Sequence, residues 1–139
     1  MMDMQINMDI SKRVVIRPDA LHWTDAPSPG IRQCVLEKGE SDASRTTAIV
    51  ELAPGSRFLS DCEYGEEIVV LDGTLSDETE NYGSGDYIKN PPGSSHAYES
   101  ASGCLLLMKR QHLEAGEDRR IVVRLLATHG IRGWWMACQ

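Results

Sequence analysis

The chain has 139 residues, a length that suits one compact domain with a single core. Its 14 Lys and Arg residues against 21 Asp and Glu residues give a net charge of -7. No stretch gathers the basic residues into a stripe, so we expect no nucleic-acid partner. No apolar run approaches the length of a membrane span, and the acidic N-terminus lacks the pattern of a secretory signal. We therefore expect a cytoplasmic protein with no membrane partner.

Short apolar runs rich in β-branched residues follow one another along the chain, and each has the length of a strand. In order they are RVVIR from residue 13, IRQCVLEK from 31, RTTAIVEL from 45, EEIVVLDG from 66, DYIK from 86, GCLLLMKRQ from 103 and RIVVRLL from 120. Gly- and Pro-rich segments separate them and favour tight turns, as at Asp72-Gly73. No segment shows a helical stripe. The pattern predicts one all-β domain over residues 1–139, a barrel or a sandwich.

Four cysteines are scattered along the chain without a C-x-x-C pair. They are Cys34, Cys62, Cys104 and Cys138. In a chain without a secretory signal this spacing is typical of reduced thiols, and it excludes a zinc ribbon.

The segment GDYIKNPPGSSHAYES, residues 85–100, is the most specific stretch of the sequence. It fits the pattern G-x5-P-x-G-x2-H-x3-N at Gly85, Pro91, Gly93 and His96, with Ser100 at the position of Asn. This pattern is the second motif of the cupins. The Gly and Pro residues shape turns around a short strand, and His96 then enters the next strand with its ring directed into the barrel. A lone histidine without such a motif is more often a core residue.

Further blocks of the sequence resemble the ChrR-type cupins. The resemblance covers about residues 22–112 and includes HWTDAPSPGIRQCVLEKG, RTTAIVELAPGSRF, GEEIVVLDGTLSDE and GCLLLMK. These cupins are relatives of the C-terminal domain of ChrR anti-sigma factors and of small acetylacetone dioxygenase-like cupins. The resemblance implies a cupin fold, a double-stranded β-helix or jelly-roll barrel. It also implies one divalent metal near the barrel mouth, held by His-x-His, a Glu and a later His.

ChrR also has an N-terminal zinc-binding domain with an H-x3-C-x2-C pattern. This sequence lacks that pattern, so we do not expect a direct anti-sigma role.

The sequence departs from the family where the pattern F-P-x-H-x-H is expected. Counting down from Gly55 and Phe58 places Asp61 and Glu63 at the two histidine positions. Counting back from GEEIVVLDG places Ser60 and Cys62 there instead. One residue is missing from the intervening turn, so the two counts disagree and neither restores the histidines.

The resemblance implies that the strand that follows carries the family's ligand Glu. Glu66 aligns with it, because both the distance to Gly73 and the distance to His96 match the family. Glu67 points to the opposite face of the strand by alternation, which makes it a reserve ligand.

Three arrangements of the site remain open. The set Asp61, Glu63, Glu66 and His96 is rich in carboxylates and favours hard ions such as Mn²⁺ or Fe²⁺ over Zn²⁺. Cys62 with Glu66 and His96 makes a three-ligand set that suits zinc or iron. In the third arrangement the metal is absent, and Glu66 pairs with His96 inside an apolar pocket. The expected cofactor is therefore a divalent metal (Mn, Fe or Zn) or none.

Three functions from different classes fit these observations. We rank first a small-molecule-binding cupin of unassigned activity, with Tyr87 and Tyr98 beside the second motif as candidate pocket residues. A metal-dependent dioxygenase acting on a small dione is an alternative. A metal-free cupin with a binding or sensory role is another, and a redox sensor predicts an exposed Cys62 with a lowered pKa.

The expected partners are a small-molecule ligand and a second copy of the chain. Long apolar strands and the aromatic pair Trp134 and Trp135 favour a homodimer.

Overall fold

Strands make up almost all regular structure in the described part of this computed structural model, residues 5–40, 45–112 and, as backbone only, 121–124. The elements are η1 (Pro18–Ala20), β1 (Thr24–Asp25), β2 (Ile31–Lys38), β3 (Thr46–Leu52), β4 (Ser56–Cys62), β5 (Glu66–Ser76), β6 (Asn81–Gly83), β7 (Asp86–Asn90), β8 (Ser94–Ser100), β9 (Cys104–Arg110) and β10 (Ile121–Arg124). η1 is a single 3-10 turn. The predicted all-β class is confirmed.

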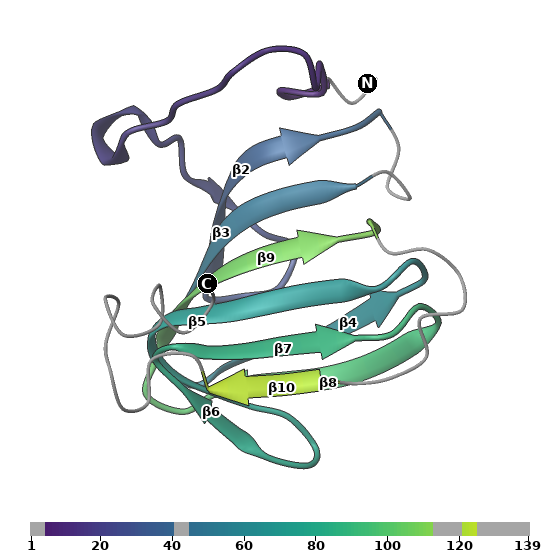
Figure 1. Cartoon of the computed structure of the whole chain (residues 1–139). Helices are drawn as coiled ribbons and strands as arrows, with labels where there is room; N and C mark the ends of the chain where they lie inside the picture. The colour runs from purple at the N-terminus through teal and green to yellow at the C-terminus, as the bar shows by residue number, and fades with distance from the viewer. Residues whose placement is uncertain (1–4, 41–44, 113–120, 125–139) are drawn as a thin grey trace.

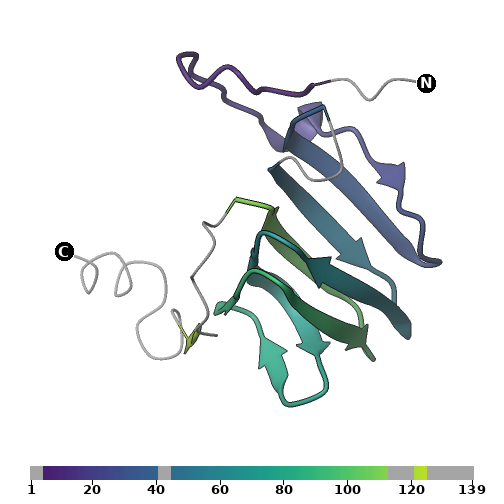
Figure 2. The ribbon, with the colours of Figure 1, turned by 90° about the vertical axis from the view of Figure 1, so that its right-hand side faces the viewer.

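Two curled antiparallel sheets share strand β5. The larger sheet has the order β1-β2-β3-β9-β5-β7-β10 (Figure 1). The smaller joins β4 to β8, and the last residues of β5 pair with β6 and β8. Turned by 90°, the molecule shows how strongly the strands curl (Figure 2). The architecture is the jelly roll that the family resemblance implies, here in the form of a half-barrel.

The core lies between the inner faces of the two sheets, because alternate residues of each strand point inward. In β3, for example, Ala48, Val50 and Leu52 are buried while their neighbours are partly exposed. The buried cluster contains Ile31, Ala48, Val50, Leu52, Ile68, Val70, Leu75, Tyr82, Ile88, Tyr98, Cys104, Leu106 and Met108. The described cysteines, Cys34, Cys62 and Cys104, are buried free thiols, as the cysteine spacing predicts.

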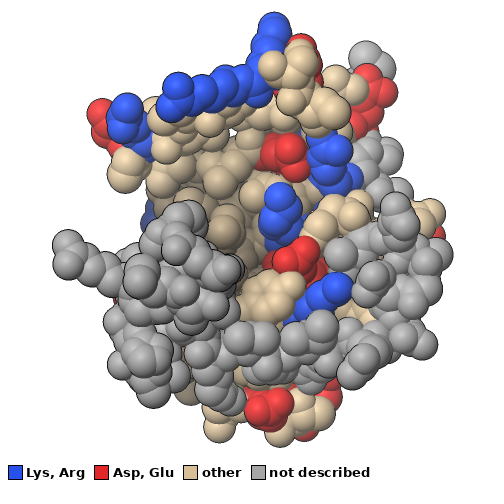
Figure 3. Space-filling model, viewed as in Figure 1, with Lys and Arg blue, Asp and Glu red and all other residues tan. Residues whose placement is uncertain are grey.

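The outer face of the larger sheet carries charges of alternating sign. One cross-strand row runs through Glu37, Thr47, Lys109, Glu67 and Lys89, each opposite the next. Acidic and basic side chains alternate down this face of the molecule (Figure 3). Opposite charges on neighbouring strands stabilise the sheet, and the mixed row offers no surface of one sign.

Strand β5 does not turn at Asp72-Gly73, so that prediction is wrong. The strand continues to Ser76, with a bulge opposite β9 between Val70 and Asp72. Gly73 has a φ of +80°, and a Cβ atom there would collide with the backbone carbonyl of Gly103. The bulge and the glycine bend β5 out of the first sheet and into the second.

The predicted strand at residues 13–17 is also absent. Val14, Val15 and Ile16 are 48%, 57% and 38% exposed, and Pro18 opens the 3-10 turn immediately afterwards. The outer edge of β2 is occupied instead by β1 and by a bridge from Ile6 to Lys38. A β-branched run needs a free edge to become a strand, and here another segment holds that edge.

Some sequence-based expectations fall outside the described residues. The tryptophan pair at 134 and 135 is among them, so its part in a dimer stays a prediction. Within the described ranges, no helix combines the length and the apolar character needed to cross a membrane.

Candidate functional site

The carboxylate of Glu66 lies at the start of β5 and is fully buried inside the barrel. Ser60 Oγ donates a hydrogen bond to its Oε1 at 2.5 Å. Asn90 Nδ2 and the Tyr98 hydroxyl donate to its Oε2 at 2.9 Å and 3.2 Å. Asn90 Nδ2 also donates to the Tyr98 oxygen at 2.6 Å. Residues from β4, β7 and β8 thus satisfy a carboxylate that burial would otherwise destabilise.

Arg110 supplies a positive charge beside this carboxylate. It ends β9 in phase with Leu106 and Met108, and its Nε lies 3.5 Å from Glu66 Oε1. Its Nη2 donates to the backbone carbonyl of Asp61 at 2.7 Å. The guanidinium therefore compensates a buried acid and ties the end of β9 to the end of β4.

The alternation of β4 decides between the two counts for the histidine positions. Ser60 and Cys62 are buried, whereas Asp61 and Glu63 are exposed. Asp61 Oδ1 accepts a hydrogen bond from Ser95 Oγ at 2.6 Å on the outside of the barrel. The structure thus brings Ser60 and Cys62 toward Glu66 and does not bring Asp61 and Glu63 there.

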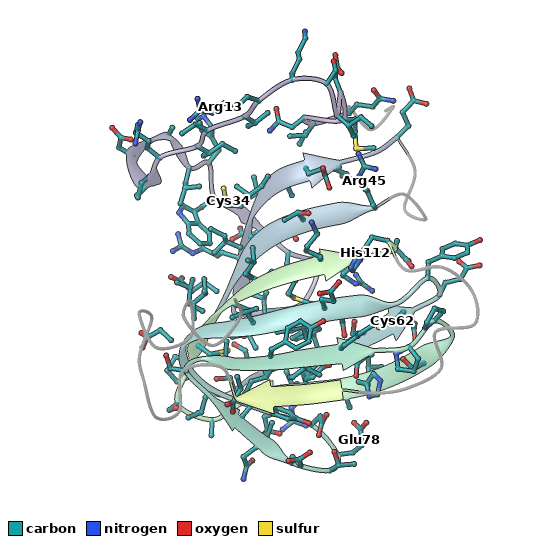
Figure 4. The ribbon with its side chains drawn as sticks, viewed as in Figure 1. Arg13, Cys34, Arg45, Cys62, Glu78 and His112 are labelled. Carbon is teal, nitrogen blue, oxygen red and sulfur yellow. The ribbon has the colours of Figure 1, made fainter. Side chains whose placement is uncertain are left out.

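His96 lies opposite Ser60 on β8, but its hydrogen bond is to the loop between β5 and β6. Its Nδ1 is 2.9 Å from Glu78 Oε1, and the Ala97 N–H donates to Glu78 Oε2 at 3.1 Å. These bonds, led by that to His96, lower the pKa of Glu78. Nε2 of His96 is buried and has no hydrogen-bond partner among the described residues. Figure 4 shows Glu78 in its loop, apart from Cys62.

Among the described residues, one group of three His, Cys, Asp or Glu side chains has ligand atoms within 4.8 Å of one another. It contains Asp77, Glu78 and His96, so a group that could hold a metal exists where the loop between β5 and β6 meets β8. Asp77 already accepts hydrogen bonds from the N–H groups of Thr79 and Glu80 and from the Tyr82 hydroxyl. Burial alone would raise the pKa of Asp77, but these bonds together outweigh it and hold the pKa below its usual range.

The residues at the family's four ligand positions, Ser60, Cys62, Glu66 and His96, do not fit a divalent cation as they lie. Both oxygens of Glu66 accept hydrogen bonds, and Arg110 stands beside them. Burial, and then the nearby charge of Glu66, raises the pKa of Cys62 to about 12. A metal ligand must be a thiolate, and this raised pKa favours the neutral thiol in the metal-free protein.

The same two properties of Cys62 contradict the redox-sensor hypothesis. The residue is 1% exposed and its pKa is raised, whereas a sensor needs an accessible thiol with a lowered pKa.

Glu67 and Tyr87 form a separate cluster on the outer face of the larger sheet. The Tyr87 hydroxyl donates to Glu67 Oε2 at 2.7 Å, and His112 Nε2 lies 2.5 Å from Glu67 Oε1. Burial, followed by this bond to Glu67, raises the pKa of Tyr87. The structure therefore places the reserve ligand and one of the two candidate pocket tyrosines away from Glu66, while Tyr98 contacts it directly.

A pocket of about 310 Å³ opens on the inner face of β2, β3 and β9, beside Arg110. Phe58 and Leu59 of β4 close one side. Its lining in the described chain is Ala26, Pro27, Ser28, Ile31, Gln33, Thr46, Ala48, Val50, Phe58, Leu59, Met108, Arg110 and Gln111. The walls are mainly apolar, and one end is polar.

Sequence reasoning missed Asn90 and Arg110 as site residues, and it placed Ser60 at a histidine position in one count without giving it a role. For Arg110 a signal was present, because the alternation of Leu106 and Met108 in GCLLLMKR continues to Arg110. For Ser60, the same alternation from Phe58 would have sufficed. Asn90 precedes the Pro pair of the motif and alternates with Ile88, which places it on the inner face.

A family model described as the ChrR Cupin-like domain matches residues 11–114. The anti-sigma factor ChrR from Rhodobacter sphaeroides, in complex with SigE, has 22% identity and a TM-score of 0.56 over 68% of this chain and 50% of that chain. This chain thus spans about half the length of the ChrR chain.

Two further structures align over most of both chains. An acetylacetone dioxygenase-like cupin from Methylibium petroleiphilum has 18% identity and a TM-score of 0.65 over 79% of this chain and 86% of that one. The polyketide cyclase RemF from Streptomyces resistomycificus has 16% identity and a TM-score of 0.60 over 85% and 89%. At these identities the likeness shows the fold, while the functions vary. No curated protein matches the sequence.

Proposed function

Because the chain belongs to the family of ChrR cupin-like domains, we propose that it is a small-molecule-binding cupin whose ligand lies in the pocket of β2, β3 and β9. The observation that carries this proposal is the pocket itself. It is concave, mainly apolar and polar at one end, as small-molecule sites are. Its volume of about 310 Å³ is at the small end of the usual range of about 300–1000 Å³, so we expect a small ligand.

The experiment is a fragment screen by ligand-observed NMR, with hits measured by calorimetry. Gln33→Trp places a large side chain in the pocket, and Arg32→Trp is the matched control, because Arg32 is the exposed neighbour on the same strand. We expect hits to bind the unchanged protein and Arg32→Trp, and to lose affinity for Gln33→Trp. Hits that bind Gln33→Trp as well as the control would contradict the proposal, as would a screen without hits.

A metal-dependent enzyme of the dioxygenase kind is the second candidate, and the group Asp77, Glu78 and His96 favours it. A divalent ion held there would act as a Lewis acid toward a bound oxygen atom. The sequence names Mn, Fe or Zn, or no metal, for a different set of ligands around Glu66 and His96, so the ion at this group is for the experiment to identify.

Elemental analysis of protein purified without chelator or a histidine tag tests this candidate. About one equivalent of metal, lost in both His96→Ala and Glu78→Ala and retained in Glu63→Ala, is the result expected of a real site. Metal-free protein would remove the second candidate and leave the first untouched. The cytoplasmic location expected from the sequence stays a prediction.

A further inference from the structure

We propose that Arg110 binds an acid group of the ligand, so that the pocket selects a small monocarboxylate with an apolar body and does so without a metal. This inference rests on the proposed small-molecule function.

The charge of the pocket is the first argument. Arg110 is the single charged residue among the described residues that line it. Glu66, the acid whose charge offsets that of Arg110, is fully buried in the core and does not line the pocket. The charge at the pocket wall is therefore the positive charge of Arg110. It favours an anionic ligand over a neutral one, and a neutral ligand over an amine.

Unused hydrogen-bond donors are the second argument. A guanidinium offers five N–H donors. Among the described residues Arg110 makes one hydrogen bond, from Nη2 to the Asp61 carbonyl, and its buried Nε lies beside Glu66 Oε1. The donors left for a ligand are therefore the N–H groups of Nη1 and the second N–H of Nη2. Gln111 lines the same end of the pocket, and its Oε1 is held by the Tyr64 N–H at 2.7 Å, which leaves its amide nitrogen to donate. A carboxylate accepts such bonds in pairs.

The third argument is that the guanidinium is held in position before a ligand arrives. The Asp61 carbonyl fixes one terminal nitrogen, and the carboxylate of Glu66 lies 3.5 Å from Nε. Glu66 is itself fixed by Ser60, Asn90 and Tyr98. Binding then costs little side-chain ordering.

The rest of the ligand is defined by the walls. Ile31, Val50, Phe58 and Met108 offer apolar surface for a short chain or a single ring. The acid group and the apolar body would thus occupy opposite ends of one pocket.

The test compares three probes with one skeleton, 3-phenylpropanoate, 3-phenylpropanamide and 3-phenylpropylamine, by calorimetry in the presence of EDTA. We expect the acid to bind, the amide to bind roughly ten- to a hundredfold more weakly, and the amine not to bind. Arg110→Met should remove the preference for the acid, whereas Arg57→Met, a change to an exposed arginine on β4, should keep it.

Two further variants keep the test decisive. Where Arg110→Met fails to fold, the double variant Glu66→Gln, Arg110→Met removes the uncompensated acid and should fold with the preference lost. Glu66→Gln alone should tighten binding of the acid, because it removes a competing negative charge.

The possible outcomes separate this inference from the proposed function. Equal affinity for acid and amide, EDTA-sensitive binding, or a preference that survives the loss of Arg110 would overturn the inference. If neutral fragments bind as well as acids and Gln33→Trp abolishes their binding, the proposed small-molecule function stands, while the inference that Arg110 selects a carboxylate is wrong. If no probe or fragment binds, both fall.

Discussion

The carboxylate of Glu66 is buried with three hydrogen-bond donors and one guanidinium around it, and each neighbour comes from a different strand. Ser60 and Arg110 contact Oε1, and Asn90 and Tyr98 contact Oε2. At the residue scale, the stability of this cluster depends on charge balance, because an unpaired buried acid is costly.

We expect Arg110→Met to lower the free energy of unfolding by about 1–3 kcal/mol, less than for a fully buried pair because Arg110 is 36% exposed. Adding Glu66→Gln should recover part of that loss, since the amide needs no counterion. Urea unfolding of the two single variants and the double variant measures the coupling between them. Purely additive losses would show that the two groups do not interact.

The buried thiol of Cys62 makes the free energy of unfolding depend on pH in the alkaline range. Burial raises its pKa from 9.0 to about 12 in the folded protein. Below pH 9 the thiol is protonated in both states, and its stabilising effect is fully present. Between pH 9 and 12 the unfolded chain releases a proton that the folded chain keeps, so this effect declines by about 1.4 kcal/mol per pH unit.

Cys62→Ala should therefore flatten the fall of unfolding free energy between pH 9 and 11, measured by urea unfolding. Val50→Ala also removes core volume but removes no titrating group. Its unfolding free energy should therefore fall with pH as steeply as that of the unchanged protein. Parallel curves for Cys62→Ala and the unchanged protein would exclude this role of the thiol.

At the scale of elements, the bend of β5 depends on one glycine. Gly73 combines a φ of +80° with close contact to the backbone of Gly103, and Gly55 has a similar φ of +83° with nothing within 4 Å of a Cβ position. We expect Gly55→Ala to cost about 1–2 kcal/mol from backbone strain alone. Gly73→Ala should cost clearly more, because β5 or β9 must also move. Thermal or urea unfolding of both variants checks this order, and equal losses would refute the close-contact argument.

The accuracy of sequence-based prediction also differs between elements for physical reasons. β3, β5 and β9 were predictable because β-branched and apolar residues mark buried strands. β4 was not, since it reads SRFLSDC and its inner face carries small polar residues that serve the Glu66 cluster. The predicted strand at residues 13–17 was wrong, because strand propensity does not show whether a sheet edge is free for pairing. Glu66 was identified by alignment, whereas its partnership with Arg110 depends on the pairing of β5 with β9, which local sequence does not specify.

At the scale of the whole molecule, the prediction of a homodimer concerns surfaces that lie partly outside the described residues. We expect light scattering after size exclusion to give twice the mass of one chain. A chain without residues 125–139 tests whether the segment containing Trp134 and Trp135 is needed. A dimer that survives this truncation would place the interface elsewhere, and a monomeric full-length chain would remove the prediction.

The position of β9 has a consequence for how the protein is made. β9 lies between β3 and β5, so residues 104–110 pair with residues 46–52 on one side and with 66–73 on the other. During synthesis, both of those strands are complete well before the strand that separates them. Until β9 is translated, the nascent chain carries two unpaired apolar edges, which are sites for premature association. The long-range pairing also predicts slow folding compared with a helical domain of the same size.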